Sequence, residues 1–306
     1  MKSRSWNYWV VVWDDIFFKP RDTTACAVVR IAFGLTLLPY ALILGLDLIQ
    51  FHSETGLLPY SVSVALVDPD VLSPLGWLAP NDVMLWFCFY LFVIQVLLLL
   101  FGVKSRLQAI CVFFWLVAFQ HRNNLLIDGG DTLARLLAFY LFCMPCGERF
   151  SLDSFLEQKK HIKPRELPVW GLRLLQIQMV LLYISTALSK AGGTKWLDGS
   201  AMVYVVQLND VFGRFPLPQF LLGSLPALHV LTWLVLVVEF LIPIGLCVKR
   251  TRMITVGLAI LFHLALDYSM NLYLFQWFMI VGLLSFVDWE RFGVAGKRVG
   301  SEIFQP

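Results

Sequence analysis

The chain has little of the charge that covers a soluble protein. Asp, Glu, Lys and Arg make up 15% of its 306 residues, where a soluble domain carries roughly 25%. The net charge is only +3 and there is no long basic run, so nucleic acid is not an expected partner. Six cysteines in a chain of this length do not form a disulfide framework. These deficits argue against a soluble enzyme, a disordered regulator and a nucleic-acid binder.

The chain also lacks the short signatures of nucleotide-binding and hydrolytic sites. It contains no P-loop, GxGxxG, HExxH or GxSxG motif. One C-x-x-C is present at Cys143 and Cys146, without a histidine or acidic residue at metal-ligand spacing. The pair falls at the inner end of an expected membrane span, where the reducing cytoplasm disfavours a disulfide. We therefore predict no metal site and two small buried thiols.

Apolar sequence is what the chain has in abundance. Hydrophobic residues make up 58% of it, and its mean hydropathy is +0.73. A bilayer core requires about 20 apolar residues per helix. The runs therefore predict an all-α, polytopic membrane bundle that forms a single domain over 1–306. The eight expected spans are 25–49, 83–103, 107–127, 131–147, 169–190, 227–247, 253–275 and 276–287.

The distribution of Lys and Arg predicts the orientation of these spans. With the N-terminus inside, 17 of the basic residues fall in inner segments and 3 in outer segments. Because basic residues accumulate on the cytoplasmic side, this asymmetry predicts eight crossings with both termini in the cytoplasm. The expected location is the bacterial inner membrane.

The segment 1–24 precedes the first span and does not resemble a signal peptide, since its apolar run is too short. Trp6, Trp9 and Trp13 share one helical face. This face predicts an interfacial helix that lies on the membrane.

Two outer loops are long and too apolar to be ordinary solvated loops. They are 50–82 and 191–226, and both contain Pro, Gly and aromatic residues. We expect them to fold back over the bundle as a cap, with short interfacial helices. The inner loop 148–168 is hydrophilic and is expected to be a cytoplasmic connector.

Span five carries a polar stripe that ends in a lysine. Gln176, Tyr183 and Lys190 are spaced by seven, and Thr186 falls on the same face. A charge in hydrocarbon costs several kcal/mol and requires an explanation. One explanation is a partly desolvated lysine whose neutral amine acts as a base. The other is a lysine that snorkels at a helix end.

Span seven carries His263, Asp267 and Asn271 at successive i+4 steps. They are interpreted either as a proton relay in which Asp267 orients the imidazole, or as a hydrogen-bond network between helices. Glu239 lies near the middle of span six, with Arg30 or Lys190 as its candidate partner. The alternative for Glu239 is a purely structural buried pair.

A dense polar cluster is expected at the outer mouth of spans three and four. Asp131 and Arg135 are an i,i+4 pair beside His121-Arg122-Asn123-Asn124 and Asp128-Gly129-Gly130. We expect Asp131 to be ionised and held by Arg135 or Arg122, so that its removal strands a buried arginine at roughly 3–5 kcal/mol. We also expect the cluster to face Lys190 across one outward-opening cavity. The alternative is an ordinary helix cap.

Several segments together resemble the HTTM family, the membrane domain shared with vitamin K-dependent γ-glutamyl carboxylase. Their order and spacing cover nearly the whole chain. The segments are Arg30-Ile31-Ala32-Phe33-Gly34, His121-Arg122-Asn123-Asn124 followed by Gly130-Asp131, Phe150-Ser151-Leu152-Asp153, Leu188-Ser189-Lys190 followed by Lys195-Trp196-Leu197-Asp198-Gly199, and Phe262-His263 followed by Asn271-Leu272-Tyr273-Leu274-Phe275.

The resemblance implies lyase-type chemistry on a reduced, vitamin K-like quinone, with O2 and CO2 as co-reactants. In the animal carboxylases a lysine before a W-x-x-G deprotonates the quinone, and Lys190 matches it, six residues before Trp196. His263 matches the histidine of the later segment. The resemblance thus gives Lys190 and His263 as catalytic residues, and we expect Asp131 of the outer cluster to complete the catalytic set. The expected binding set is His121, Arg122, Arg135, Tyr183, Thr186, Trp196, Glu239, Asp267 and Asn271.

Two departures from the carboxylases favour a second hypothesis. The carboxylases carry a histidine where this chain reads Asp128-Gly129-Gly130-Asp131. The sequence also ends at Pro306, without the large extramembrane portion that holds protein substrates. Other bacterial members of this family resemble factors that mature secreted peptide toxins. The alternative is therefore a non-catalytic membrane factor for maturation or export, whose partners are membrane lipid and a secreted peptide.

Overall fold

The computed structural model describes residues 2–66, 73–79, 81–159, 166–208, 213–215, 218, 220 and 223–289. Helices dominate these residues, as the all-α prediction required. The expectations for Met1, the side chain of Trp6, the chain end and parts of the two outer loops and the connector lie outside the described residues.

Each of the eight predicted spans contains a helix. In the described part of the chain, five are long and apolar enough to cross a membrane: α2, α6, α10, α15 and α16. The bundle is thus a helical membrane fold, while the count of eight crossings stays a prediction. The helices are α2 Thr24–Leu46, α6 Asp82–Phe101, α7 Ser105–Arg122, α8 Gly129–Cys143, α10 Trp170–Ala191, α15 Leu225–Cys247, α16 Arg252–Ser269 and α17 Phe275–Leu283, which continues as η2 Leu284–Phe286.

Local sequence sets where these helices begin and end. The side chain of Asn81 caps α6 by accepting from the Met84 amide, and Gly102 ends that helix at a φ of 77°. Helix α8 begins with a capping box in which Asp128 and Asp131 accept from each other's amides. Helix α16 ends at Ser269, so Asn271 lies beyond the helix and not on its expected face.

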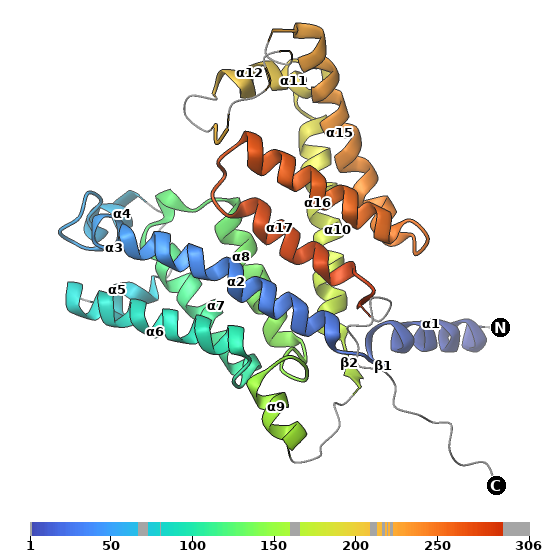
Figure 1. Ribbon diagram of the computed structural model, residues 1–306, viewed down its shortest axis with the longest axis horizontal. Helices are drawn as coiled ribbons and strands as arrows, with labels where there is room; N and C mark the ends of the chain where they lie inside the picture. Colours follow the sequence, from blue (N-terminus) through green and yellow to red (C-terminus); the bar gives the residue numbers. More distant parts are fainter. Residues whose placement is uncertain are drawn as a thin grey trace.

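The helices pack in two groups joined by α17 and by the packing of α8 against α10 (Figure 1). In the first group α2 lies along α6, and α7 packs against both α6 and α8. In the second group α15 packs against α10 and α16. Helix α17 contacts α2 and α8 on one side and α10 and α16 on the other. Most of its residues are buried, so this short helix is a core element of the bundle.

Short elements occupy the long loops. The first outer loop contains α3 Leu48–His52, α4 Tyr60–Leu66 and α5 Pro74–Leu78, and α5 packs against α6 and α7. The second contains α11 Thr194–Leu197 and α12 Ala201–Gln207, which pack against α15. The short helices expected in these loops are therefore present.

The segment expected to be a plain connector contains two short elements. The segment 148–168 contains α9 Leu152–Lys159 and β2 Leu167–Pro168, and β2 pairs antiparallel with β1 Pro20–Arg21. Helix α1 Lys2–Phe17 extends away from the bundle, with Trp9 and Trp13 exposed (Figure 1). The β1–β2 pairing links the start of α2 to the start of α10.

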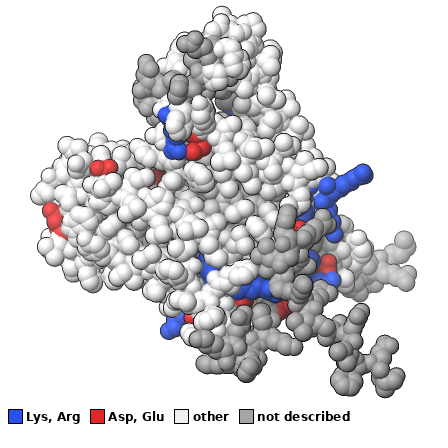
Figure 2. All heavy atoms as spheres, viewed as in Figure 1, with Lys and Arg blue, Asp and Glu red and all other residues white. Residues whose placement is uncertain are grey.

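Charge and apolar surface are segregated on the molecule. Figure 2 shows Lys and Arg gathered over the side of α9 and the β1–β2 pair, while the helix faces are almost entirely uncharged. Large hydrophobic side chains such as Leu42, Phe87 and Leu258 are exposed on those faces. Such a surface is suited to lipid rather than to water.

Candidate functional site

Lys190 at the end of α10 forms an ion pair with Glu239 of α15. The Lys190 Nζ donates to Glu239 Oε1 and lies 5.1 Å from the centre of the Trp196 ring. The lysine side chain is 26% exposed and the glutamate side chain 8%. The pair is therefore partly screened at the lysine and desolvated at the glutamate, whose Oε2 has no hydrogen-bond partner.

Arg30, which was considered as a partner of Glu239, makes other contacts. Its guanidinium is fully buried and donates to Ser105 Oγ at 3.3 Å, to the Cys146 carbonyl at 3.1 Å and to the Phe150 carbonyl. It therefore ties α2 to the turn after α8 and is not the partner of Glu239. Cys146 and Cys143 are buried free thiols.

A buried hydrogen-bond chain joins α10, α16 and α17. The Tyr183 hydroxyl lies 2.6 Å from His263 Nε2, and His263 Nδ1 lies 2.5 Å from Gln276 Oε1. An amide oxygen only accepts, so Nδ1 carries the proton and Nε2 accepts from the Tyr183 hydroxyl. The neutral imidazole is held in one tautomer from both sides.

Gln276 therefore orients His263, and the expectation that Asp267 does so is wrong. Sequence spacing pointed to Asp267 because it lies four residues along the same helix. Gln276 reaches the imidazole from α17, which no spacing within α16 reveals. The available signal was a single amide in an otherwise apolar segment.

Asp267 belongs to a separate cluster at the C-terminal end of α16. Arg214 donates to Asp267 Oδ2 at 2.8 Å and to Asn271 Oδ1 at 3.0 Å. Arg214 comes from the second outer loop, so this contact attaches the loop to the bundle. The other carboxylate oxygen of Asp267, Oδ1, is buried without a partner.

The polar stripe of span five divides among different neighbours. Gln176 donates to the Ser285 carbonyl at 2.6 Å, while Tyr183 contacts His263. Thr186 donates to the Tyr183 carbonyl of its own helix at 3.1 Å. Gln176, Tyr183 and Lys190 therefore contact neighbouring elements, while Thr186 bonds within α10.

Asp131 is not held by an arginine. Its Oδ1 accepts from the Tyr40 hydroxyl at 2.7 Å and from Gln120 Nε2 at 3.2 Å, and its Oδ2 accepts from the Asp128 amide at 3.0 Å. Tyr40 comes from α2 and Gln120 from α7. The carboxylate thus sits where three helices meet.

The two arginines expected to pair with Asp131 have other contacts. Arg135 lies 2.8 Å from His121 Nε2. Arg122 is buried, donates to the His52 carbonyl at 2.8 Å and stacks 3.8 Å from the centre of the Tyr60 ring. Because neither forms an ion pair with Asp131, the expected pairing is wrong, and replacing Asp131 strands no arginine.

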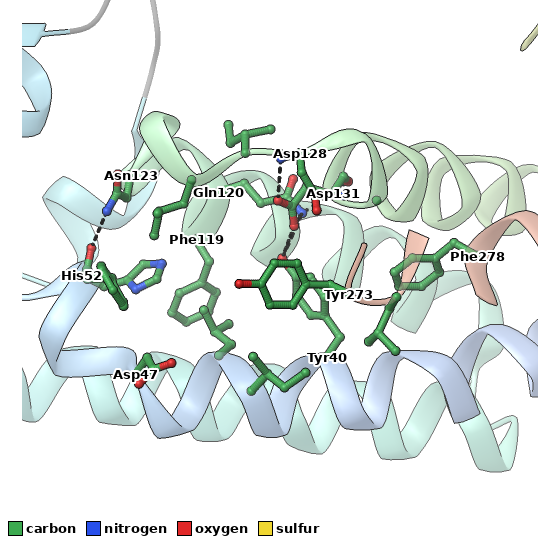
Figure 3. A pocket seen from close by; sticks show the side chains of 17 residues that line it. Tyr40, Asp47, His52, Phe119, Gln120, Asn123, Asp128, Asp131, Tyr273 and Phe278 are labelled. Atoms are coloured by element: carbon green, nitrogen blue, oxygen red, sulfur yellow. Dashed lines mark hydrogen bonds between the residues drawn. The ribbon is translucent and has the colours of Figure 1, made fainter. Parts of the chain in front are cut away.

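Two cavities lie between the helices on the side of the loops expected outside. The outer cavity, of about 250 Å³, is enclosed by α2, α7, α8 and the loop before α17, and Asp131 lines it (Figure 3). The apolar chamber, of about 520 Å³, lies between α12, α15 and α16. Lys190 lines neither, so among the described residues it does not share these cavities with Asp131.

Comparison with known proteins connects this architecture to a family. The family model described as the HTTM domain matches residues 18–290. No solved structure matches the chain.

Two curated proteins of Bacillus subtilis (strain 168) are similar to the chain. "Sporulation-delaying protein SdpB" is 26% identical over 210 residues, which cover 65% of this chain and 62% of that protein. "Uncharacterized protein YitO" is 25% identical over 175 residues, which cover 51% of this chain and 50% of that protein. The matches thus extend over less than two thirds of either relative.

Proposed function

The chain belongs to the HTTM domain family, and we propose that it is a non-catalytic membrane factor for the maturation or export of a secreted peptide. One similar protein is named for delaying sporulation. Such a name describes an effect on development and not a chemical conversion. It therefore favours the peptide hypothesis over a carboxylase-like enzyme.

The outer cavity is the observation that supports this function. It lies at the end of the bundle opposite α9 and the β1–β2 pair, where basic residues gather (Figures 1 and 2). By the distribution of basic residues, this opposite end faces outward from the cell. A cavity there is accessible to a peptide that is leaving the membrane.

The proposed arrangement in the membrane has eight crossings and places both ends of this chain in the cytoplasm of a bacterium. Support comes from the positions of the turns. The α6–α7 turn contains Lys104, with Arg106 in the first turn of α7, and the α15–α16 turn contains Lys249 and Arg250. These basic residues fit the cytoplasmic side of the inner membrane.

The experiment that tests the function compares two replacements in the bacterium that encodes the chain. Leu44 lines the outer cavity, and Leu44→Trp fills it, whereas Lys190→Ala leaves it unchanged. Mass spectrometry of the medium measures secreted peptides in the deletion strain and in strains carrying each variant. We expect a peptide that is lost on deletion and with Leu44→Trp, and retained with Lys190→Ala. The reverse pattern would refute the proposal and favour Lys190 as a base.

A quinone-dependent enzyme is the alternative proposal, supported by the concentration of Lys190, Glu239, Tyr183 and His263 inside an apolar bundle. A reduced quinone would supply the electrons for oxygen-dependent chemistry. The residues fit it poorly, because the described lining of the apolar chamber contains no charged side chain. Lys190 would also have to lose its proton beside the Glu239 carboxylate, which stabilises the ammonium form. Lys190-dependent oxygen consumption by the purified chain with a reduced quinone would support this alternative.

A further inference from the structure

The outer cavity is acidic. Asp47, Asp128 and Asp131 line it, and no Lys or Arg is found in its described lining. None of the three forms an ion pair with a described residue. Asp131 is held by a hydroxyl, an amide side chain and a backbone amide, all of which are neutral. Its charge therefore has hydrogen-bond partners in place but no counter-ion.

Three deeply buried polar atoms of the cavity also lack partners. Gln120 is 5% exposed, His52 is 7% exposed and Asn123 is 2% exposed, and all three line the cavity. Gln120 Oε1, His52 Nδ1 and Asn123 Oδ1 have no hydrogen-bond partner. Figure 3 shows Gln120 beside Asp131 and the His52 imidazole directed toward Phe119. Because buried polar atoms normally have hydrogen-bond partners, the Gln120 amide oxygen beside Asp131 indicates a missing hydrogen-bond donor.

The walls between these polar groups are aromatic. Tyr40, Phe119 and Phe278 are contributed by helices, and Tyr273 lies across the cavity in front of Tyr40 (Figure 3). Aromatic walls pack against an aliphatic stem, and their ring faces attract a cation. The described residues include no set of three His, Cys, Asp or Glu close enough to hold a metal ion. The lining is therefore better suited to an organic cation.

We propose that the outer cavity binds a lysine side chain of the secreted peptide, with its ammonium group at Asp131 and Gln120. The inference rests on the proposed function and names the group by which the peptide is held. An ammonium carries three donors and a positive charge, which match an amide oxygen without a partner and a carboxylate without a counter-ion.

The rim favours a peptide over a lipid headgroup that carries the same ammonium. Asp47 and Asp128 are exposed at the edge of the cavity. An ethanolamine headgroup would bring its phosphate close to these two carboxylates, and like charges repel. A lysine side chain is attached to a neutral backbone and brings no such anion.

The direct test measures binding to the full chain in nanodiscs made of lipids without ethanolamine headgroups. The probes are Nα-acetyl-lysine methylamide and its uncharged analogue Nα-acetyl-norleucine methylamide, with titration followed by NMR line broadening. We expect the lysine probe to bind and the norleucine probe to bind roughly tenfold more weakly or not at all. Equal binding of the two probes would overturn the proposal.

Variants locate the binding at the cavity. Asp131→Asn is expected to weaken binding of the lysine probe roughly tenfold or more, and Asp47→Asn at the rim is expected to weaken it about threefold. Asp198→Asn is the matched control, since Asp198 is an exposed acid near α11 outside the lining. Asp47→Asn keeps the test decisive if Asp131→Asn does not fold. Unchanged binding in Asp47→Asn, or an equal loss in Asp198→Asn, would refute the site.

The remaining outcomes separate this inference from the proposed function. Tighter binding of phosphoethanolamine than of the lysine probe would identify a lipid headgroup site and overturn the peptide assignment. If the peptide is lost from the medium with Leu44→Trp but the lysine probe does not bind, the function stands and this inference fails. If the lysine probe binds at Asp131 but deletion leaves every secreted peptide unchanged, the proposed function fails and the ammonium site stands.

Discussion

The ion pair of Lys190 and Glu239 is asymmetric, because the acid is buried and the base reaches partly into solvent. Replacing Glu239 with Gln leaves an uncompensated ammonium beside a desolvated amide, and we expect a loss of about 3 kcal/mol in the free energy of unfolding. The double variant Glu239→Gln with Lys190→Met should recover most of it. Unfolding in detergent measures both, with Lys195→Met as the control. If the double variant is no more stable than Glu239→Gln alone, the pair is not what the single variant breaks.

His52 couples stability to pH. Burial, together with the nearby positive charge of Arg122, lowers the pKa of its imidazole from 6.5 to about 4. The unfolded chain therefore binds more protons than the folded chain between these two values. The contribution of the neutral His52 to the free energy of unfolding is fully present above pH 6.5. It is lost as the pH falls toward 4, by at most about 3 kcal/mol. Unfolding in detergent at pH 7.5 and pH 5 should show a smaller acid loss for His52→Asn than for the parent. Identical losses would show that His52 is not the group responsible.

Residue spacing predicted the position of Asp131 in its helix better than it predicted its partners. Asp131 lies in the first turn of α8, as its position after Asp128-Gly129-Gly130 predicted. Its donors Tyr40 and Gln120 come from α2 and α7, which an i,i+4 rule within one helix does not detect. The rule identified Arg135 as the partner, yet Arg135 contacts His121.

Among the elements, α10, α16 and α17 are fastened by the chain Tyr183–His263–Gln276. Gln276→Leu removes the acceptor of the Nδ1–H and strands a buried donor, so we expect a loss of about 1–3 kcal/mol in stability. Replacing His263 with Leu in the Gln276→Leu protein removes the stranded donor. This second replacement should therefore lower the stability by less than Gln276→Leu does. Thr186→Val, which affects a hydroxyl bonded to its own helix, is the control. Unfolding in detergent measures these stabilities. A Gln276→Leu protein as stable as the parent would show that this hydrogen-bond chain does not fasten the helices.

Hydropathy predicted helix positions but not how each helix is surrounded. An apolar run results from contact with lipid or from burial in protein, and the two leave the same signal. Helices α6 and α15 expose large apolar faces, whereas α17 is buried among four other helices. Its nine residues followed by a 3-10 turn are short for a membrane span. The pairing of Pro20 with Pro168 had no sequence signal, because two residues are too few to form a periodic pattern.

At the scale of the whole molecule, basic residues gather at one end and acids line the outer cavity at the other. The same asymmetry supports the proposed orientation in the membrane, in which the anionic cavity opens on the outer side. Orientation and the proposed recognition of a cation therefore depend on one distribution of charge. The crossings of α8 and α17, the two shortest helices of the bundle, are the part of this arrangement that needs a direct measurement.

Cysteine labelling tests those two crossings. Asn124→Cys and Glu148→Cys flank α8, while Tyr273→Cys and Asp288→Cys flank α17. Each is introduced singly after Cys247, which is exposed, is replaced by Ser. Because the basic connectors are retained in the cytoplasm, we expect a membrane-impermeant maleimide to label positions 124 and 273 on intact cells, and positions 148 and 288 only after permeabilisation. Lys249→Cys serves as the cytoplasmic control and Asp198→Cys as the outer one. Labelling of positions 273 and 288 from the same side would show that α17 does not cross the membrane. Labelling of positions 124 and 148 from the same side would show that α8 does not cross it.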